Sequence, residues 1–526
     1  MRSLQVFLCC AFLAAFSAAP AAEPVSRQVV VVVWDGMRPD FISAETTPNL
    51  WALAQRGVFF ASHHPVYISA TEINGTAIAT GAYPGHSTIL GDKEFRPGID
   101  PQKYIGDEKP DSVRRGDAIS SNHYVAVPTV AEILHAQGLR TAIAGSKQIA
   151  LLHDRLPRLD APASSPVVFE GDVMPGGLKP VLAGRLGDFP AIGKNPATGR
   201  DIEKTARDAW STSALVDVLW QDGVPPFSLL WLAEPDFSQH NTAPGSPQSL
   251  LAIRSSDNNL GRVLAELARR GLSASTDVMV VSDHGFSTIQ AISDIATDLS
   301  KAGFDATRVP LGGLQAGQVM VVSNGGTAFL YVGGHNPDIT RRVGLWLQTR
   351  DYAGVIFTRT PVEGTFALAE AHIDSPEAPD IVVALRWDLG RNRYGTIGMI
   401  ASDLADRGVG DGNHASLSAT DMHNTLVAAG PDFRTGVRDT LPSANTDLAP
   451  TILWLLGYKA EAAKMDGRVL GEALAVDAPP LKTYDLKRLT ARRETDTGTW
   501  EQYLQVSEVN GVRYLDEGNG AWARRH

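Results

Sequence analysis

Short apolar runs alternate along the chain with amphipathic segments. Residues 29–34 form an uninterrupted, valine-rich apolar run, which is the pattern of a strand buried on both faces. Further strands are predicted at 58–60, 140–144, 227–233 and 277–282, and helices at 47–57, 129–137, 205–220 and 256–270. Strands that alternate with helices in this way predict an α/β fold, with a parallel sheet covered by helices on both faces.

Three stretches depart from this alternation. Residues 157–199 are rich in Gly, Pro and Ala and predict an irregular insertion, whereas shorter apolar runs within 301–387 predict a smaller accessory or cap unit. The tail at 481–526 is polar, with one strand-like run at 512–515. We therefore expect one large unit over residues 22–480 with these two insertions, followed by a C-terminal extension.

The first 21 residues have the pattern of an export signal. Arg2 precedes an apolar run at 4–15, and residues 19–21 form an Ala-x-Ala cleavage site. The pattern predicts a mature protein in the periplasm or outside the cell, without stable membrane insertion; an uncleaved N-terminal anchor is the alternative. Cys9 and Cys10 are the only cysteines. The mature chain would therefore have no disulfide, thiolate metal site or cysteine nucleophile.

The net charge of the chain limits the kinds of molecule that it is expected to bind. The formal net charge of −11 argues against a broad nucleic-acid-binding surface. A small anionic substrate would need local positive charge from a metal ion, Arg or Lys. Nothing in the sequence indicates the oligomeric state.

Acidic and histidine residues follow the predicted strands. The carboxyl ends of parallel strands meet at one edge of an open α/β sheet, so these side chains are expected to converge there. Three Asp and three His would suit two divalent metal ions with nitrogen and oxygen ligands. Each residue alone has an ordinary alternative as a turn residue, cap or core histidine. The candidates are Asp35, Asp236, His240, Asp283, His284 and His414.

A hydroxyl nucleophile is also present. Residues 69–81 are predicted to be a loop that enters a short helix, with Thr71 near the helix start. A hydroxyl at a helix N-terminus beside a metal ion is deprotonated more easily than in water. Asn74, three residues further on, could donate a hydrogen bond to a developing oxyanion. The alternative is that Thr71 serves only as a helix N-cap.

Taken in order, these motifs resemble those of the alkaline phosphatase superfamily and, more narrowly, of the type I phosphodiesterase/nucleotide pyrophosphatase family. The resemblance covers about residues 28 to 460 and includes the segments 31–40, 47–50, 69–81, 234–240, 282–285 and His414. It implies a three-layer α/β/α sandwich with an alkaline-phosphatase-like fold. The Cys-x-Pro-x-Arg motif of sulfatases is absent.

The resemblance also implies how the candidate residues are used. Two divalent ions, expected to be zinc, would lie close together, as in other two-metal hydrolases. Thr71 would attack phosphorus, and water would then hydrolyse the phospho-threonine intermediate. One ion would be held by Asp236, His240 and His414, and the other by Asp35, Asp283, His284 and Thr71.

Two positions differ from the family pattern near the metal and phosphate sites. The last metal-binding histidine is often followed by Gly in the family, whereas Ala415 follows His414, and His423 is therefore a rival ligand. Asp92 occupies the position of a phosphate-binding Asn. Asn74 consequently has no counterpart in the family.

The substrate-binding positions are mixed. Glu72 stands where nucleotide pyrophosphatases place a base-stacking aromatic residue, while Trp231 matches another aromatic position and has a core role as its alternative. Lys147 matches a lysine of phosphomonoesterase relatives, but Ile149 replaces the arginine that accompanies it. An exposed, structurally idle lysine is the alternative for Lys147.

These observations predict an exported two-metal hydrolase of phosphoric esters that acts on phosphodiesters or nucleotide pyrophosphates. A phosphomonoesterase with the same nucleophile is the close alternative. A phosphoryl or head-group transferase and an inactive binding protein on the same fold are more distant ones.

Overall fold

The computed structural model describes residues 27–155, 165–197, 199, 201–404, 407–476, 478–480 and 483–524. The predicted signal peptide and both cysteines lie outside the described residues.

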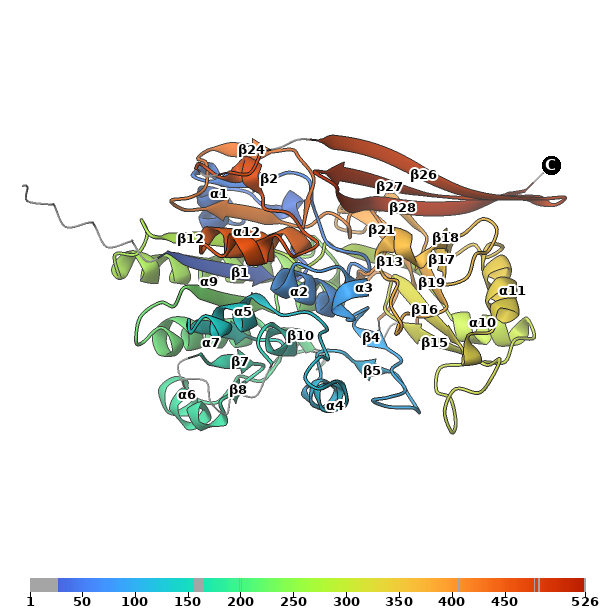
Figure 1. Cartoon of the computed structure of the whole chain (residues 1–526), viewed down its shortest axis with the longest axis horizontal. Helices are drawn as coiled ribbons and strands as arrows, with labels where there is room; N and C mark the ends of the chain where they lie inside the picture. The colour runs from blue at the N-terminus through green and yellow to red at the C-terminus, as the bar shows by residue number, and fades with distance from the viewer. Residues whose placement is uncertain are drawn as a thin grey trace, which may run out of the picture.

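A nine-stranded mixed sheet forms the core of the larger part of the molecule, on the left in Figure 1. Its strand order is β24-β2-β23-β12-β1-β11-β6-β7-β8, and β1 pairs in parallel with both β11 and β12. The strands are β1 (Gln28–Trp34), β2 (Val58–Phe60), β6 (Thr141–Gly145), β7 (Val167–Phe169), β8 (Asp172–Met174), β11 (Phe227–Leu232), β12 (Thr276–Val281), β23 (Leu426–Ala429) and β24 (Val437–Asp439).

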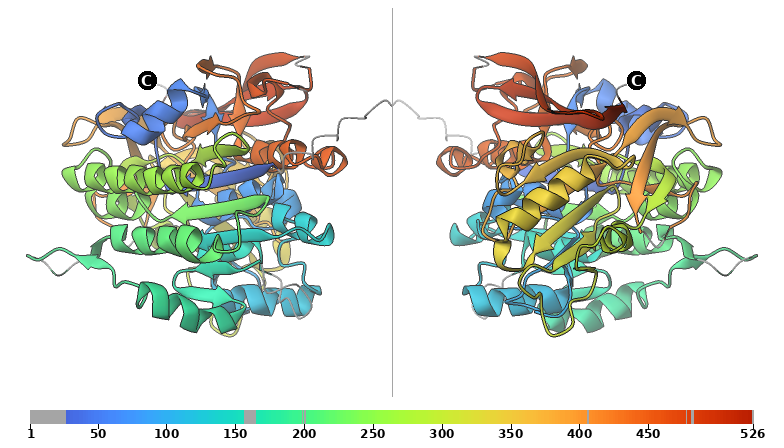
Figure 2. Two further views of the ribbon diagram at one scale, coloured as in Figure 1. Left: turned by 90° about the vertical axis from the view of Figure 1, so that its left-hand side faces the viewer. Right: turned by 90° about the vertical axis from the view of Figure 1, so that its right-hand side faces the viewer.

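Helices cover both faces of this sheet, and Figure 2 shows the strands between the helical layers. Side chains alternate along β1: Val31 belongs to one hydrophobic core and Val32 to the other. The first core includes residues of α2 (Thr71–Thr80), α5 (Val130–Ala136) and α12 (Leu448–Leu455). The second includes residues of α1 (Pro48–Gln55), α7 (Thr205–Ser213) and α9 (Pro247–Arg269). The predicted three-layer α/β/α architecture is confirmed.

Part of the segment expected to be an irregular insertion belongs to the large sheet. β7 pairs in parallel with β6, and β8 continues the sheet to its edge. Strands of three residues within a Gly- and Pro-rich stretch have too few positions to show a periodic pattern. The same region contains α6 (Lys179–Leu186) and the β9 (Gly193–Lys194)–β10 (Asp201–Glu203) pair.

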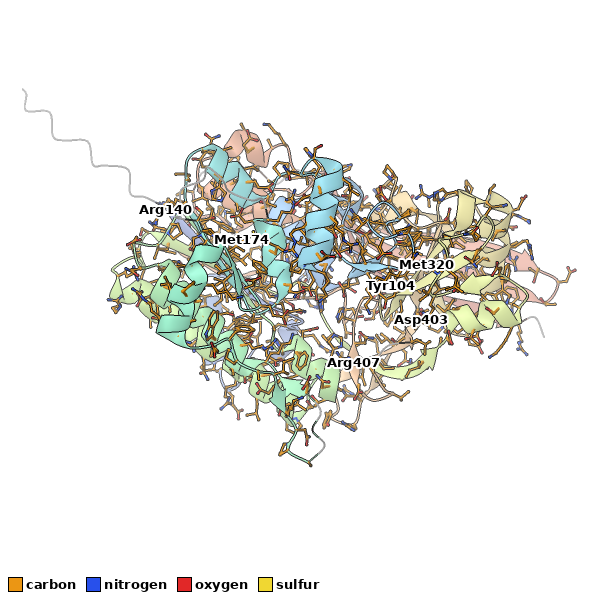
Figure 3. All side chains as sticks on the ribbon, turned by 90° about the horizontal axis from the view of Figure 1, so that it is seen from below. Tyr104, Arg140, Met174, Met320, Asp403 and Arg407 are labelled. Carbon is orange, nitrogen blue, oxygen red and sulfur yellow. The ribbon has the colours of Figure 1, made fainter. Side chains whose placement is uncertain are left out.

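A second, six-stranded sheet is formed within the 301–387 region. Its order is β14-β15-β16-β19-β17-β18, with β14 (Ala306–Thr307), β15 (Val319–Ser323), β16 (Thr327–Val332), β17 (Ala353–Thr358), β18 (Phe366–Ala367) and β19 (Ile381–Leu385). In Figure 3, Met174 marks the large sheet and Met320 the six-stranded sheet at the other end of the molecule.

The six-stranded sheet shares a hydrophobic core with the helix that begins at Thr71. Ile73 and Ala77 of α2 share a hydrophobic core with Phe329 and Phe357 of the six-stranded sheet. The other face of that sheet is covered by α10 (Ile295–Lys301) and α11 (Pro337–Leu347). Helix α2 is therefore held between the two sheets, which limits its freedom to move relative to the ends of the central strands.

The remaining elements connect these layers. A four-stranded sheet contains β20 (Trp387–Arg391), β21 (Ile397–Asp403), β13 (Ser287–Ser293) and β22 (Gly412–Asn413), and short pairs join β3 (His63–His64) to β25 (Ser443–Ala444) and β4 (Lys93–Glu94) to β5 (Ile105–Gly106). The shorter helices are α3 (Pro84–Ser87), α4 (Pro110–Ser120), α8 (Asp236–Thr242) and α13 (Lys459–Ala462). Across the described ranges, no helix combines the length and apolar character that crossing a membrane requires.

The C-terminal segment is a three-stranded antiparallel sheet, a more regular structure than its polar sequence suggests. It consists of β26 (Tyr484–Thr495), β27 (Gly498–Val509) and β28 (Val512–Arg524). β27 buries alternate residues, including Trp500 and Gln502. The Gln502 amide accepts a hydrogen bond from the Ile356 N–H at 2.8 Å and donates one to the Ile356 carbonyl at 3.0 Å. This side chain thus joins β27 to β17.

We expect Gln502→Leu to lower the free energy of unfolding by about 2–4 kcal/mol, because two buried backbone groups lose their partner at about 1–3 kcal/mol each. Chemical denaturation of the purified protein measures this change. Glu501→Ala, at an exposed position on the same strand, is the control and should change stability by less than about 0.5 kcal/mol. Equal effects of the two substitutions would show that the amide does not join the sheets.

Candidate metal centre and nucleophile

The candidate metal ligands lie where three neighbouring parallel strands end. Asp35 follows β1, Asp236 opens α8 after β11, and Asp283 and His284 follow β12. Since β1 lies between β11 and β12, these side chains meet at one edge of the sheet. His414 joins them from the loop after β22. The sheet order, rather than closeness in sequence, assembles the site.

The ligand atoms form two groups that share Asp236. Asp236, His240 and His414 form one group, and Asp35, Asp236 and His284 form the other; within each, the ligand atoms lie within 4.8 Å of one another. Asp236 Oδ1 is 3.2 Å from His240 Nε2 and 3.6 Å from His414 Nε2. His284 Nε2 is 3.6 Å from Asp35 Oδ1 and 3.4 Å from Asp283 Oδ2.

All three histidines are oriented by backbone carbonyl groups. The Nδ1 atom of His240 is 3.1 Å from the Gly412 carbonyl oxygen, that of His284 is 2.8 Å from the Gly285 oxygen, and that of His414 is 3.0 Å from the Ser69 oxygen. A carbonyl oxygen only accepts, so each Nδ1 carries the proton. In the neutral tautomer that this hydrogen bond selects, Nε2 presents a lone pair toward the carboxylates, as in metal-binding histidines.

The carboxylates also offer unused lone pairs. Asp35 Oδ1, Asp236 Oδ1 and Asp283 Oδ2 are buried and have no hydrogen-bond partner. Unpaired buried carboxylate oxygens are costly, and bound cations are one way in which proteins satisfy them. Neutral imidazoles combined with carboxylates form a donor set suited to zinc and similar divalent ions. The residues present fit a metal centre.

Burial and mutual charge control protonation at this site. Burial, together with the neighbouring Asp283, raises the pKa of Asp35 well above its usual value. Burial lowers the pKa of His414 well below its usual value, which keeps that imidazole neutral and able to bind a metal ion. Burial disfavours the charged form of Lys147 as well, but Asp236 and Asp35 outweigh it and hold the pKa of Lys147 well above its usual range.

Thr71 is the first residue of α2 and lies beside this centre. Its Oγ1 is 3.3 Å from His284 Nε2 and 3.3 Å from Lys147 Nζ. Ala70 occupies the N-cap position, and the Thr71 side chain makes no capping hydrogen bond. The hydroxyl therefore points to the candidate ligands instead of to the helix backbone.

Lys147 is part of the same group of contacts. Its Nζ lies 2.8 Å from Asp35 Oδ2 and 3.4 Å from Asp236 Oδ2, and the side chain is only 15% exposed. The alternative of an exposed, idle lysine does not hold. Ile149, at the position of the relatives' arginine, is fully buried in the core and supplies no charge.

Asn74 does not have the geometry expected of an oxyanion donor. Its amide nitrogen lies within 3.1 Å of the Val66, Ile68 and Ala70 carbonyl oxygens, and its Oδ1 accepts a hydrogen bond from the Val66 N–H at 2.7 Å. The side chain is fully buried and all its hydrogen-bonding capacity is used. Asn74 fixes the loop before Thr71, so the expectation of a catalytic contact is corrected to a positioning role.

Trp231 also differs from its expected role as a substrate-stacking surface. It is fully buried in β11, and its indole N–H donates to Asp35 Oδ2 at 2.9 Å. No face of the ring is accessible to a ligand. Trp231 instead orients a candidate metal ligand from within the core, which is the alternative that the sequence left open.

Glu72 and Asp92 lie together on the other side of Thr71. The Glu72 N–H donates to Asp92 Oδ1 at 3.2 Å, and Glu72 is almost fully buried. Burial and the nearby Asp92 raise the pKa of Glu72 well above its usual value. The resemblance predicts a phosphate-binding Asn at the position of Asp92 and an aromatic ring at that of Glu72, and the structure has a pair of carboxyl groups there.

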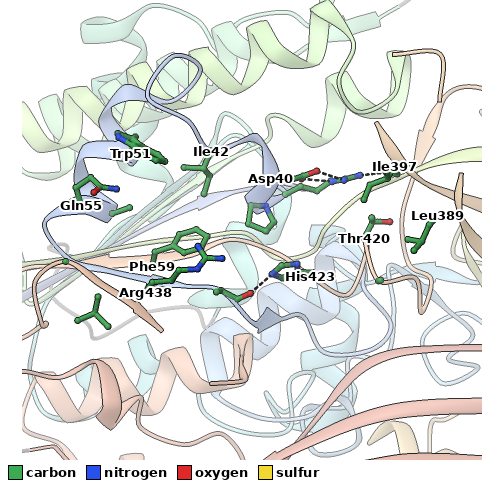
Figure 4. Close-up of a pocket in the computed structure, with 17 residues that line it drawn as sticks. Asp40, Ile42, Trp51, Gln55, Phe59, Leu389, Ile397, Thr420, His423 and Arg438 are labelled. Carbon is green, nitrogen blue, oxygen red and sulfur yellow. Dashed lines mark hydrogen bonds and ion pairs between the residues drawn. The ribbon is translucent and has the colours of Figure 1, made fainter. Parts of the chain in front are cut away.

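The rival ligand His423 lies in a different part of the molecule. It lines a cavity of about 640 Å³ with Phe59, Trp51 and Arg438, shown in Figure 4. Its Nε2 lies 3.0 Å from the Ala61 carbonyl oxygen. Burial, with a contribution from His64, lowers the pKa of His423 to about 4. The structure brings His414, not His423, to the candidate ligands.

Some supporting residues have no signal in the sequence. Asn445 donates to the Asp283 carbonyl at 2.6 Å and to Asn74 Oδ1 at 2.9 Å. Asp208 accepts hydrogen bonds from the Ala233 N–H at 2.8 Å and the Glu234 N–H at 3.2 Å, just before Asp236. These contacts join distant parts of the chain, and only the folded arrangement reveals them.

The three-layer arrangement is that of an alkaline-phosphatase-like fold. It carries an enzyme-like centre, which consists of two groups of candidate metal ligands with Asp236 in common and of Thr71 at the start of a helix. Residues 29–389 match the family model for type I phosphodiesterase / nucleotide pyrophosphatase. The chain belongs to this family, which supports hydrolysis of phosphoric esters.

Solved structures agree with this fold. Murine ectonucleotide pyrophosphatase / phosphodiesterase 5 superposes with a TM-score of 0.55 at 17% sequence identity, covering 82% of this chain and 95% of that chain. The same values apply to an inactive form of the murine protein in complex with AMP. The human counterpart gives a TM-score of 0.53 at 17% identity, with the same coverage.

We expect His414→Ala to lower the bound metal per chain, because it removes one neutral nitrogen ligand. His423→Ala should retain the wild-type metal content, since this residue faces another cavity. Elemental analysis of each variant, after dialysis against buffer with a trace concentration of the metal ion, measures the bound metal per chain. The reverse pattern would show that the C-terminal ligand is His423.

Proposed function

We propose that this protein is an exported hydrolase of phosphoric esters that uses two divalent metal ions and a threonine nucleophile to cleave phosphodiester or nucleotide pyrophosphate bonds. The observation that carries the proposal is the position of Thr71 Oγ1, 3.3 Å from both Lys147 Nζ and His284 Nε2, beside two groups of candidate ligands. A helix-capping role would not require a lysine ammonium and candidate metal ligands beside the Thr71 hydroxyl.

The chain's own residues would prepare the nucleophile. The N-terminus of α2 and the Lys147 ammonium both favour negative charge on Thr71 Oγ1. Packing of α2 between the two sheets and the Asn74 contacts hold that oxygen in place. When bound, two metal ions, proposed to be zinc, would supply Lewis acidity and neutralise charge that develops on phosphate oxygens.

The ligand assignment keeps the first group as it stands, and in the second group it replaces the shared Asp236 by Asp283, whose Oδ2 lies 3.4 Å from His284 Nε2. Asp236, His240 and His414 are proposed to hold one ion, and Asp35, Asp283, His284 and Thr71 the other. The reaction has two displacements. Thr71 Oγ1 forms a bond to phosphorus as the ester oxygen leaves, and a water molecule then attacks phosphorus and releases Thr71. Each step exchanges one oxygen substituent for another.

The surroundings of Thr71 support a diester more than a monoester. A monoester brings two negative charges to the site, whereas a diester brings one. Lys147 is accompanied by the apolar Ile149, and the carboxyl groups of Glu72 and Asp92 lie nearby. Phosphomonoesterase activity remains the second candidate because Lys147 directly contacts Thr71. The AMP bound by the murine relative supports a nucleotide as substrate.

Export rests on the sequence of the first 21 residues. A periplasmic or secreted hydrolase would meet small phosphate esters outside the cytoplasm. Small substrates also agree with the net charge of −11, which argues against a broad nucleic-acid-binding surface.

We expect Thr71→Ala to lower turnover by at least about 10³-fold, since the nucleophile is removed. Its metal content should stay close to that of the wild type, because the histidine and carboxylate ligands remain. Steady-state kinetics and elemental analysis of the same preparation test both statements. Wild-type turnover by this variant would refute the nucleophile assignment.

Three chromogenic substrates test the reaction class with metal-loaded wild-type protein: p-nitrophenyl phosphate, bis-p-nitrophenyl phosphate and thymidine p-nitrophenyl monophosphate. We expect kcat/KM for the two diesters to exceed that for the monoester. A preference for the monoester would instead support the phosphatase alternative. Absence of turnover on all three, with metal bound, would contradict the proposed activity.

A further inference from the structure

The cavity that His423 lines has no part in the proposed reaction. Its volume of about 640 Å³ lies within the range of about 300–1,000 Å³ that is usual for small-molecule sites. The residues that line it all belong to the described ranges, and none of them is a candidate metal ligand. The cavity is therefore a separate place where this protein could hold a ligand.

Segments far apart in the sequence enclose this cavity. One wall comes from α1 and the edge strands β2 and β24 of the large sheet, and the other from the antiparallel pair β20 and β21 of the four-stranded sheet. Residues 38–40 and 419–423 complete the lining. Figure 4 shows Trp51 toward one end of the labelled side chains and Leu389 toward the other. An elongated ligand fits this arrangement better than a compact one.

The walls are mainly aliphatic and aromatic. Ile42 and Trp51 line the cavity from the side of α1, and Leu389 and Ile397 line it from β20 and β21. Trp51 is 40% exposed and Leu389 is 59% exposed, so both keep much of their apolar surface in contact with water. Exposed apolar side chains that border a cavity are typical of ligand-binding grooves. The walls therefore indicate a ligand with an apolar body.

The polar groups of residues 38–40 and 419–423 are fixed by the protein itself. The Arg38 guanidinium donates to both carboxylate oxygens of Asp40, at 2.9 and 2.6 Å, so these two charges compensate each other. Arg38 Nη1 also donates to the carbonyl oxygens of Phe286 at 3.0 Å and Ile397 at 2.8 Å. The Thr420 carbonyl accepts a hydrogen bond from the Phe286 N–H at 3.1 Å. The cavity is thus formed in advance, and little ordering of side chains opposes binding.

Arg438 brings a positive charge that the lining does not compensate. It lies opposite Phe59 in the β2–β24 pair, and its guanidinium carbon is 4.9 Å from the centre of the Phe59 ring. The side chain is exposed and has no ion-pair partner among the residues that the structure describes. Burial lowers the pKa of His423 to about 4, so this neighbour is uncharged under neutral conditions. The charge of Arg438 is therefore available to an anion in the cavity.

We propose that this cavity binds an amphipathic monoanion, a carboxylate on an unbranched alkyl chain, whose head group pairs with Arg438 and whose chain lies against the apolar walls. A guanidinium matches a carboxylate through two parallel N–H donors. Burial of the chain removes apolar surface from water, which favours binding. A cationic amphiphile would instead be repelled by Arg438. The site shares no residue with the proposed hydrolytic centre.

Decanoate, used below the concentration at which it forms micelles, is the probe for this site. Isothermal titration calorimetry with the purified protein compares it with two relatives: decylammonium has the opposite head-group charge, and butyrate lacks most of the chain. We expect decanoate to bind at least about tenfold more tightly than either, because decylammonium loses the charged hydrogen bonds and butyrate the burial of methylene groups.

Substitutions at the lining locate the binding. Arg438→Gln should weaken the binding of decanoate by at least about tenfold and should not weaken that of decylammonium. Leu389→Asp should also weaken the binding of decanoate, since it places a negative charge at an exposed position of the wall. Arg56→Gln is the matched control: Arg56 is an exposed arginine at the end of α1 that does not line the cavity, and its loss should change the affinity by less than about twofold. Melting temperatures show whether each variant is folded.

Three results would overturn the proposal. Decanoate does not bind to the wild-type protein, or it binds to Arg438→Gln as tightly as to the wild type. Decylammonium binds more tightly than decanoate, in which case the ligand is not an anion. Sedimentation velocity finds a wild-type dimer that Leu389→Asp dissociates, in which case the cavity belongs to an interface between two copies of the chain. None of these measurements depends on hydrolysis, so the proposed function is tested separately by the kinetics of the Thr71 variant.

Discussion

The arrangement of this protein depends on three buried carboxylates that converge at the ends of neighbouring strands. Two unit charges about 4 Å apart interact by about 4 kcal/mol at an effective dielectric constant of about 20, so like charges at this distance strongly oppose folding. Lys147, with its Nζ 2.8 Å from Asp35 Oδ2, offsets part of this repulsion. The remaining unpaired oxygens make the same place favourable for cations. The converging buried carboxylates thus oppose folding, and the same carboxylates are suited to bind metal ions.

The two sheets have complementary tasks around this centre. The large sheet delivers the carboxylates and His284 through its parallel order, while the smaller sheet supports α2 from the opposite side through Phe329 and Phe357. The hydroxyl of Thr71 is therefore located by packing on both sides. Precision of this kind is what a displacement at phosphorus requires, because small errors in approach raise the barrier steeply.

Much of this could be predicted from the sequence, and the failures have clear causes. Uninterrupted apolar runs revealed the buried strands. The rule that ligands gather at strand ends predicts Asp35, Asp236 and His284 at one edge of the sheet, and the structure brings these three side chains close together there. Trp231 and Asn74 were assigned to the substrate because sequence position does not show which way a side chain faces. β7 was missed because three residues are too few to establish a period, and Asn445 was missed because its contacts join segments far apart in the chain.

The three histidines are oriented by backbone carbonyl oxygens, and this limits which residues can be substituted around the site during evolution. Every residue has a carbonyl oxygen, so substitutions at the three acceptor positions preserve the hydrogen bonds as long as the backbone keeps its path. Space, however, is restricted at two of them: a Cβ on Gly285 would lie 1.9 Å from the Thr420 carbonyl oxygen, and one on Gly412 would lie 2.4 Å from the Gln239 carbonyl oxygen. The chemistry of the side chains around these histidines can therefore change during evolution, whereas residues larger than glycine are excluded at Gly285 and Gly412. Around the metal ligands, related proteins are then expected to share side-chain volume at these positions and not functional groups.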